Sequence, residues 1–241
     1  MTDPIELGAR HQQVDVRAKT VESLVDALQE RISDGEFGVG SWIRQERLAE
    51  EYGVSRMPIR EALHRLQALG VVEIVANRGA RVQMPSMRDI AEAYEVRGVL
   101  EGHAAYRAAR ACTQADIDRL HQAGKWFDEA AAQARAGAKA AAKDLWYKAN
   151  ELFHSTVIQA AGNAQLSTSI SALHHRMPRN LTWSALGGDS RLLADNAAEH
   201  MKIAQAIENR DAQSARELTI EHSAHARELV EIHVQRSTPQ R

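Results

Sequence analysis

From residue 88 to residue 235 the apolar side chains recur with a helical period, and no stretch of that region favours a strand. Short groups of helix breakers, among them Gly162-Asn163 and Gly187-Gly188, divide the region. The expected helices span residues 88–110, 114–135, 139–161, 164–186, 190–209 and 212–235. Six antiparallel helices of this kind predict a helical bundle.

The first 84 residues have a different pattern. Two β-prone runs, 71–75 and 80–84, flank Asn77-Arg78-Gly79, whose Asn and Gly suit a hairpin turn. Three helices are expected before the hairpin, at about 21–32, 45–52 and 56–68. We predict a mainly α chain divided into a flexible tail (1–17), a three-helix unit with a hairpin (18–84), a linker (85–87), the six-helix bundle (88–235) and a second tail (236–241).

Composition supports this division and narrows the setting. A chain of 241 residues is long enough for two domains, and 44% hydrophobic with 26% charged residues is typical of a globular protein. No run approaches the roughly 18 apolar residues of a membrane span, and the N-terminus lacks the apolar centre of a secretory signal. Cys112 is the single cysteine, so no intramolecular disulfide is possible. We expect a cytoplasmic protein with no membrane partner.

The segment Gly53-Val54-Ser55 joins two short helices with the spacing of a helix-turn-helix, in which the second helix enters the DNA major groove. Ser55 is placed to cap that second helix. One arc of the helix is apolar and comprises Ile59, Ala62, Leu63, Leu66 and Leu69. The adjoining arc is polar and comprises Arg56, Arg60, His64 and Gln67. One face should pack while the other reads DNA, because an arginine can donate two bonds to guanine.

A net charge of −2 does not by itself indicate a polyanionic partner, but residues 44–81 hold seven arginines against five acids. The expected hairpin is the wing of a winged helix-turn-helix, and Arg78 at its tip would reach the narrow minor groove, with Arg44, Arg47 and Arg81 on the phosphate backbone. The alternative is an ordinary solvated surface, which is the usual meaning of a single exposed arginine. The helix spacing and the following hairpin together favour DNA binding.

The string from Leu48 to Leu63 closely resembles the helix-turn-helix signature of the GntR family of bacterial transcription regulators. The resemblance spans about residues 18–84, with departures at Val39-Gly40 and Met57. It implies a homodimer that binds a short palindromic operator in double-stranded DNA. The residues expected to contact DNA are Arg44, Arg47, Ser55, Arg56, Arg60, His64, Arg78 and Gly79.

Three histidines of the expected bundle lie on apolar helix faces. His154 shares its face with Asn150, four residues earlier, while His200 and His222 lie at helical spacing from leucines and isoleucines of their own helices. Facing imidazoles in a bundle can bind a metal and leave open positions. The alternative is that each is a core histidine bonded to backbone, which is the commoner case for a single residue.

Residues 88–235 resemble the FCD effector domain of the FadR subfamily, through Glu95–Gly102, Phe153-His154 and Glu199-His200, and the six-helix count is like the VanR branch. In many such domains an Asp and three His bind a divalent metal. The corresponding residues here are Asn150, His154, His200 and His222, so the resemblance implies a zinc, nickel or manganese site with Asn in place of Asp. Without the charge of an Asp, metal binding should be weaker, and the bound ion should attract a small carboxylate effector more strongly.

Arg97 is expected to point inward, toward either Glu101 one turn on or the effector carboxylate, so both residues are candidates for the effector site. Arg176 and Arg179 are weaker candidates, and His174, His175 and His225 are weaker still. For all five, surface or packing roles are favoured.

These residues favour a ligand-responsive transcription regulator that is not an enzyme. One alternative is a metal-dependent hydrolase that uses the three histidines, although Glu151 and Glu199 adjoin the ligand positions and are expected to project elsewhere. The other alternative is a bundle that only dimerises.

Overall fold

The computed structural model describes residues 20–33, 35–76, 78–83, 85–176 and 180–237, with only the backbone of residues 33, 175, 176, 180 and 237. The predicted tail 1–17 and residues 238–241 therefore lie outside the described residues. The chain divides into two compact units, the first of which ends at Gln83. Among the described residues, no helix combines the length and apolarity that crossing a membrane requires.

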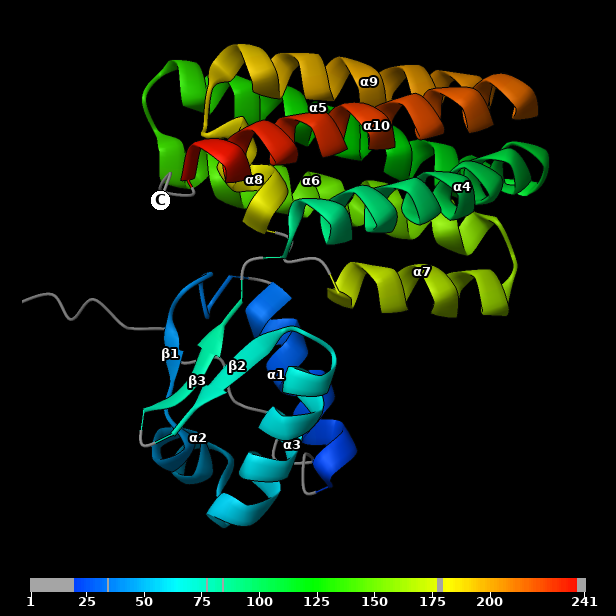
Figure 1. Ribbon diagram of the computed structural model, residues 1–241. Coiled ribbons are helices and arrows are strands. Elements are labelled where there is room, and N and C mark those ends of the chain that lie inside the picture. The colour runs from blue at the N-terminus through cyan, green and yellow to red at the C-terminus, as the bar shows by residue number, and fades with distance from the viewer. Residues whose placement is uncertain (1–19, 34, 77, 84, 177–179, 238–241) are drawn as a thin grey trace, which may run out of the picture. The chain divides into compact units, whose positions relative to one another are not determined.

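The N-terminal unit has three helices and a small sheet (Figure 1). Its elements are α1 (Val21–Ser33), β1 (Trp42–Ile43), α2 (Gln45–Tyr52), α3 (Arg56–Ala68), β2 (Val72–Val75) and β3 (Gly79–Val82). The strands are antiparallel in the order β1-β3-β2, with Trp42 opposite Arg81 and Val75 opposite Gly79. The predicted helices and hairpin are confirmed, whereas β1 was not predicted because a two-residue strand carries no alternation.

Apolar side chains from the three helices and the sheet form the core of this unit. Leu24 and Leu28 of α1 are fully buried, and so are Ile59, Leu63 and Leu66 of α3. Gly53 ends α2 in the left-handed conformation at φ 63°, which glycine adopts without steric cost. This turn brings α3 back against the core.

Two details of α3 differ from expectation. Ser55 occupies the N-cap position, but its side chain makes no capping hydrogen bond. Such a bond goes to the N–H of the second or third helical residue, and the third is Pro58, which has no N–H. Leu69, assigned to the packed face, follows the end of the helix and is 45% exposed.

The C-terminal unit consists of long helices that run beside one another (Figure 1). They are α4 (Met87–Ala111), α5 (Gln114–Arg135), α6 (Lys139–Ala160), α7 (Ala164–Arg176), α8 (Asn180–Leu186), α9 (Ser190–Glu208) and α10 (Ala212–Ser237). Ser86 and Thr113 start α4 and α5 with capping boxes, each exchanging hydrogen bonds with an aspartate three residues on. Positive φ angles at Gly137, Gly162 and Gly187 mark helix ends, as predicted.

The described part of this unit contains seven helices where six were expected. The single helix predicted over residues 164–186 is described as α7 and α8, with residues 177–179 between them outside the described residues. The prediction of one helix followed the helical period and did not take Pro178 into account. A proline inside a helix removes a backbone hydrogen bond.

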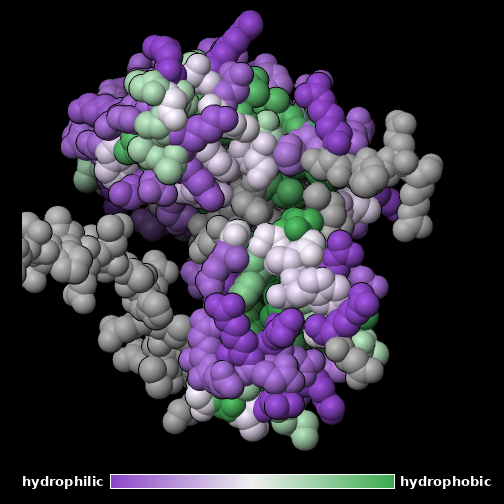
Figure 2. Space-filling view, turned by 90° about the vertical axis from the view of Figure 1, so that its left-hand side faces the viewer, coloured by the Kyte–Doolittle hydropathy of each residue, from purple (hydrophilic) through white to green (hydrophobic). Residues whose placement is uncertain are grey.

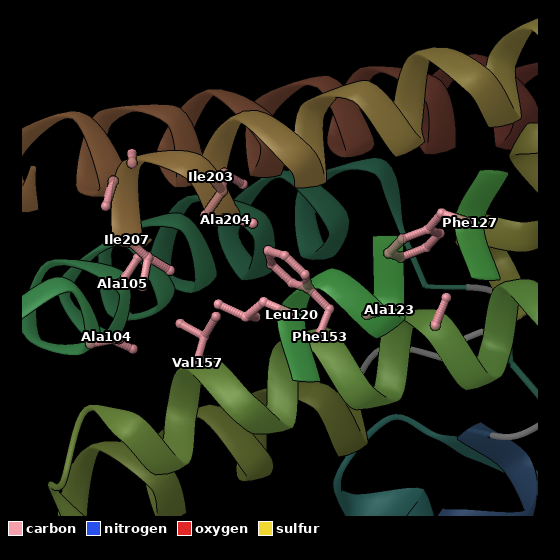
Figure 3. Packing of buried hydrophobic residues seen from close by; sticks show 14 of the residues in the cluster. Ala104, Ala105, Leu120, Ala123, Phe127, Phe153, Val157, Ile203, Ala204 and Ile207 are labelled. Carbon is pink, nitrogen blue, oxygen red and sulfur yellow. The ribbon is translucent and has the colours of Figure 1, made fainter. Parts of the chain in front are cut away.

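The core of the C-terminal unit lies where α4, α5, α6 and α9 meet. Leu120 of α5, Phe153 of α6 and Ile203 of α9 point toward one another there (Figure 3). Many of the remaining buried positions are alanines, which allow the helices to approach closely. The helices therefore lie close enough together for polar side chains on neighbouring helices to contact one another.

Candidate functional site

The exposed face of α3 carries the residues expected to read DNA. Arg56, Arg60, His64 and Gln67 are exposed, while the opposite face is buried. Arg56 Nη1 lies 3.1 Å from Glu46 Oε1 of α2, and both side chains remain more than half exposed. The helix thus presents a rigid polar edge to solvent.

The exposed arginines of this unit differ in whether they form ion pairs. Arg44, Arg47, Arg60 and Arg78 form no ion pair within the described part of the chain, so their charges are available to a partner. Arg65 pairs with Glu22 at 2.9 Å and is therefore engaged within the fold. On the face seen in Figure 2, hydrophilic residues cover most of the N-terminal unit, in the lower part of the view.

The wing residues lie beside the β2–β3 turn. Arg78 is exposed there, and Arg81 donates through Nε to the backbone oxygen of Gly40 at 3.2 Å. Gly79 has φ +105°, and a Cβ at this position would lie 2.5 Å from the carbonyl oxygen of Ile43. Glycine is thus required for β3 to pair closely with β1.

In the C-terminal unit, the three predicted histidines come together. His154 of α6, His200 of α9 and His222 of α10 are buried, and one ring nitrogen of each lies within 4.8 Å of those of the other two. The Nε2 atoms of His154 and His200 are 3.4 Å apart. Two imidazole nitrogens bound to one tetrahedral ion at about 2.0–2.1 Å would be separated by about 3.3 Å, so this pair fits a metal without rearrangement.

Hydrogen bonds at the far side of the rings orient two of these histidines. His200 donates through Nδ1 to the backbone oxygen of Asn196 at 2.8 Å, and His222 donates through Nδ1 to Glu199 Oε2 at 2.7 Å. A carbonyl and an ionised carboxylate can only accept, so the proton of each neutral ring is on Nδ1. Each Nε2 is left with a lone pair, as a metal ligand needs.

Burial holds two of these imidazoles, those of His154 and His200, in the neutral form. Burial lowers the pKa of His154 to about 3, and the nearby charge of Glu101 offsets only part of that effect. Burial, together with the charges of His222 and His154, also lowers the pKa of His200 well below its usual value. Neutral rings at physiological pH are the form that binds metals.

Glu199 corrects one expectation. Because it adjoins His200, it was expected to project away from the site, but its carboxylate accepts from His222 and also from His225 Nδ1 at 2.8 Å. Burial by itself would raise the pKa of Glu199, yet the hydrogen bonds from the two histidines lower it. A charged carboxylate therefore lies directly behind one candidate ligand.

A cavity of about 260 Å³ opens beside the histidines. Its walls include His154, His222, Asn150 and Arg97, so the structure brings together residues of the predicted metal and effector sites. The side-chain amide of Asn150 forms no hydrogen bond within the described residues. Glu151 also lines this cavity, contrary to the expectation that it would project elsewhere.

A buried charged group adjoins the cavity. Arg97 donates through Nε to Glu101 Oε1 at 2.9 Å, and His174 Nε2 lies 2.5 Å from the same oxygen. Burial opposes ionisation of Glu101, but Arg97 and His174 hold its pKa well below the usual value. Glu101 is therefore the partner of Arg97, one of the two alternatives that the sequence left open. His174, for which a surface or packing role was expected, contacts the same candidate effector residue, Glu101. The side chains of His175, Arg176 and Arg179 lie outside the described residues.

Comparison with known proteins assigns both units. Residues 20–82 match the bacterial regulatory proteins of the gntR family, and residues 92–225 match the FCD domain. A probable D-xylose utilization operon transcriptional repressor of Paenarthrobacter nicotinovorans is 29% identical over 206 residues, covering 85% of this chain and 86% of that protein. The Exu regulon transcriptional regulator of Escherichia coli (strain K12) is 27% identical over 212 residues, covering 81% and 78%.

The fold is also found among solved structures. E. coli McbR/YncC superposes with a TM-score of 0.71 at 20% identity, over 93% of this chain and 100% of that chain. Both curated relatives are transcription regulators, which removes support from the hydrolase alternative. Since its two matched segments together extend from the first helix to the last, the chain belongs to the GntR family of bacterial transcription regulators and carries an FCD domain.

Proposed function

We propose that this regulator binds a palindromic operator as a homodimer and that a small carboxylate, bound with a divalent cation in the FCD domain, changes its affinity for DNA. The observation that carries DNA binding is the exposed face of α3, where Arg56 and Arg60 project from a helix whose other face is buried. Exposed Arg44, Arg47 and Arg78 add charge suited to phosphates, and Ser55, His64 and Gly79 complete the proposed contact surface.

The homodimer follows from the geometry of an operator. The described part of the chain holds one recognition helix, whereas a palindrome presents two related half-sites. A relative named as a repressor supports repression as the mode of control. Such a protein would act in the cytoplasm, where operator DNA lies.

DNA binding is tested by replacing both arginines with alanine and measuring affinity for operator DNA from the regulator's own promoter. A bidentate arginine contact contributes about 1–3 kcal/mol, so the double variant should bind at least about 30-fold more weakly. Arg65→Ala is the matched control, because Arg65 belongs to the same helix but pairs with Glu22 and Glu61. Equal affinity of the double variant and the native protein would refute the assignment.

The proposed metal site consists of His154, His200 and His222, with Asn150 at its edge. Support comes from three buried imidazoles, two of which have their Nε2 lone pairs fixed by the hydrogen bonds that Nδ1 donates. Imidazole and amide donors suit zinc, nickel or manganese. When bound, the cation would supply positive charge and open coordination positions to an anionic ligand.

Within the described residues, the positive charge of Arg97 in the cavity wall is offset by Glu101. Binding of a carboxylate should therefore depend on the cation. Elemental analysis of untagged protein should find about one divalent metal per chain, and a chain that never retains stoichiometric metal, with or without added acids, would refute this part of the proposal.

A further inference from the structure

Polar side chains outnumber apolar ones in the described walls of the 260 Å³ cavity. Ligand pockets are lined predominantly by hydrophobic and aromatic side chains, with a few polar groups that fix orientation. Among the described wall residues the apolar side chains are the minority, and they are Ala93, Trp146, Ile158, Leu173 and Ala226.

Hydroxyl groups reach this cavity from four helices. They belong to Tyr94 of α4, Ser155 of α6, Ser167 and Ser171 of α7, and Thr182 of α8. The Tyr94 and Thr182 hydroxyls already bond each other at 3.1 Å, and Ser155 donates to the backbone oxygen of Leu152 at 3.3 Å. A wall so rich in hydroxyls binds water readily, because each hydroxyl can both donate and accept hydrogen bonds.

Three further polar groups have no internal partner. The hydroxyls of Ser167 and Ser171 and the amide of Asn150 form no side-chain hydrogen bond within the described residues, although all three line the cavity. Ser167 and Ser171 lie four apart and so share one face of α7. Their donors and acceptors are available to a bound molecule.

We propose that the natural ligand is a small polyhydroxylated carboxylic acid, of the sugar-acid class, and not an aliphatic or aromatic acid. This inference rests on the proposed function, which supplies the carboxylate and the cation beside His154 and His222. The hydroxyl-bearing carbons of the ligand lie along α7 and α8, where the serines and Thr182 exchange hydrogen bonds with them. An aliphatic acid leaves these groups without partners once their water is displaced, and that loss disfavours it.

Four six-carbon probes separate the contributions in the full chain loaded with manganese. D-gluconate and its stereoisomer D-galactonate carry both hydroxyls and carboxylate, hexanoate carries only the carboxylate, and sorbitol carries only hydroxyls. Isothermal titration should show gluconate, or its stereoisomer galactonate, binding at least tenfold more tightly than hexanoate, with sorbitol weakest.

Each other outcome has a definite meaning. Hexanoate binding as tightly as both hydroxylated acids would overturn the inference and leave the proposed carboxylate sensor standing. Sorbitol binding as tightly as gluconate would instead remove the carboxylate from the proposed function. Binding by none of the four probes would overturn both.

Substitutions on α7 provide a second measurement that does not depend on the choice of metal. The double variant Ser167→Ala plus Ser171→Ala should weaken binding of the hydroxylated acid by about five- to 150-fold, the range for two lost hydrogen bonds, and leave hexanoate binding unchanged. Ser169→Ala is the matched control, since it removes a hydroxyl from the same helix outside the cavity wall. An equal effect of the double variant on both acids would show that the serines only shape the helix.

Discussion

Replacing Glu199 by glutamine tests how the histidine site is held. Glu199 Oε2 lies 2.7 Å from His222 Nδ1, so its charge fixes the ring proton on Nδ1 and leaves Nε2 as the ligand. Glutamine has nearly the same shape but no charge. Its amide can also turn and donate to Nδ1, which would place the proton on Nε2 and block the ligand atom.

The expected effect is a 10- to 100-fold loss of metal affinity, the range found when such supporting partners are removed, or about 1.4–2.7 kcal/mol. The assay is a competition titration of zinc between the full chain and a chromophoric chelator at constant pH. Circular dichroism of the metal-free variant should match that of the native chain, because Glu199 is only half-buried and leaves the hydrophobic core untouched.

Glu221→Gln is the matched control. It removes the same charge from the same side of the unit, but Glu221 is 61% exposed and lies 3.9 Å from His225, away from the three candidate ligands. Its zinc affinity should stay within about twofold of the native value, since exposed pairs contribute roughly 0–1 kcal/mol. If Glu199→Gln also bound zinc with native affinity, the orienting role of this carboxylate would be refuted.

Three further outcomes are expected. In metal-free protein the free energy of unfolding should increase with pH between about 4 and 6.5, by up to about 1.4 kcal/mol per pH unit for each of His154 and His200. The reason is that the pKa values of these histidines lie below those of the unfolded chain, which therefore binds more protons in this range. Equal stability at pH 5 and pH 7, measured by chemical denaturation, would contradict this prediction. Gly79→Ala should destabilise the N-terminal unit by about 1–3 kcal/mol, because the new Cβ would lie 2.5 Å from the β1 carbonyl oxygen and φ +105° disfavours alanine. Thermal unfolding measures this change. Gly38→Ala is the control, since a Cβ added there has no other atom within 4 Å. Asn150→Asp should raise zinc affinity roughly tenfold in the same chelator assay, because it adds a charged oxygen beside the imidazoles, and an unchanged affinity would place Asn150 outside the site.

Much of the fold could be predicted because it depends on local sequence. The helical period and the breakers at Gly53, Gly137 and Gly162 located most helix ends, and these glycines do adopt left-handed conformations. The convergence of the three histidines also followed from local pattern, since each lies on the apolar face of its helix.

The remaining features depend on packing between distant segments. The two-residue strand β1 forms only because β3 lies beside it, with Gly79 allowing the close approach. The contact of Glu101 with His174 joins residues 73 positions apart, and that of Glu199 with His222 joins residues 23 apart. No period within one helix reveals which carboxylate will lie behind which imidazole.

The proposed function requires that the metal and the acid bound in the FCD domain change the affinity of the protein for DNA. The direct measurement is fluorescence anisotropy of labelled operator DNA with one preparation of the full chain, first loaded with manganese and saturating gluconate or galactonate, then with manganese alone, then after chelation. Coupling between sites commonly amounts to five- to 150-fold in affinity, so the dissociation constant for DNA should differ at least about fivefold between the first and second states, with no response to the acid after chelation. A single dissociation constant in all three states would contradict the account.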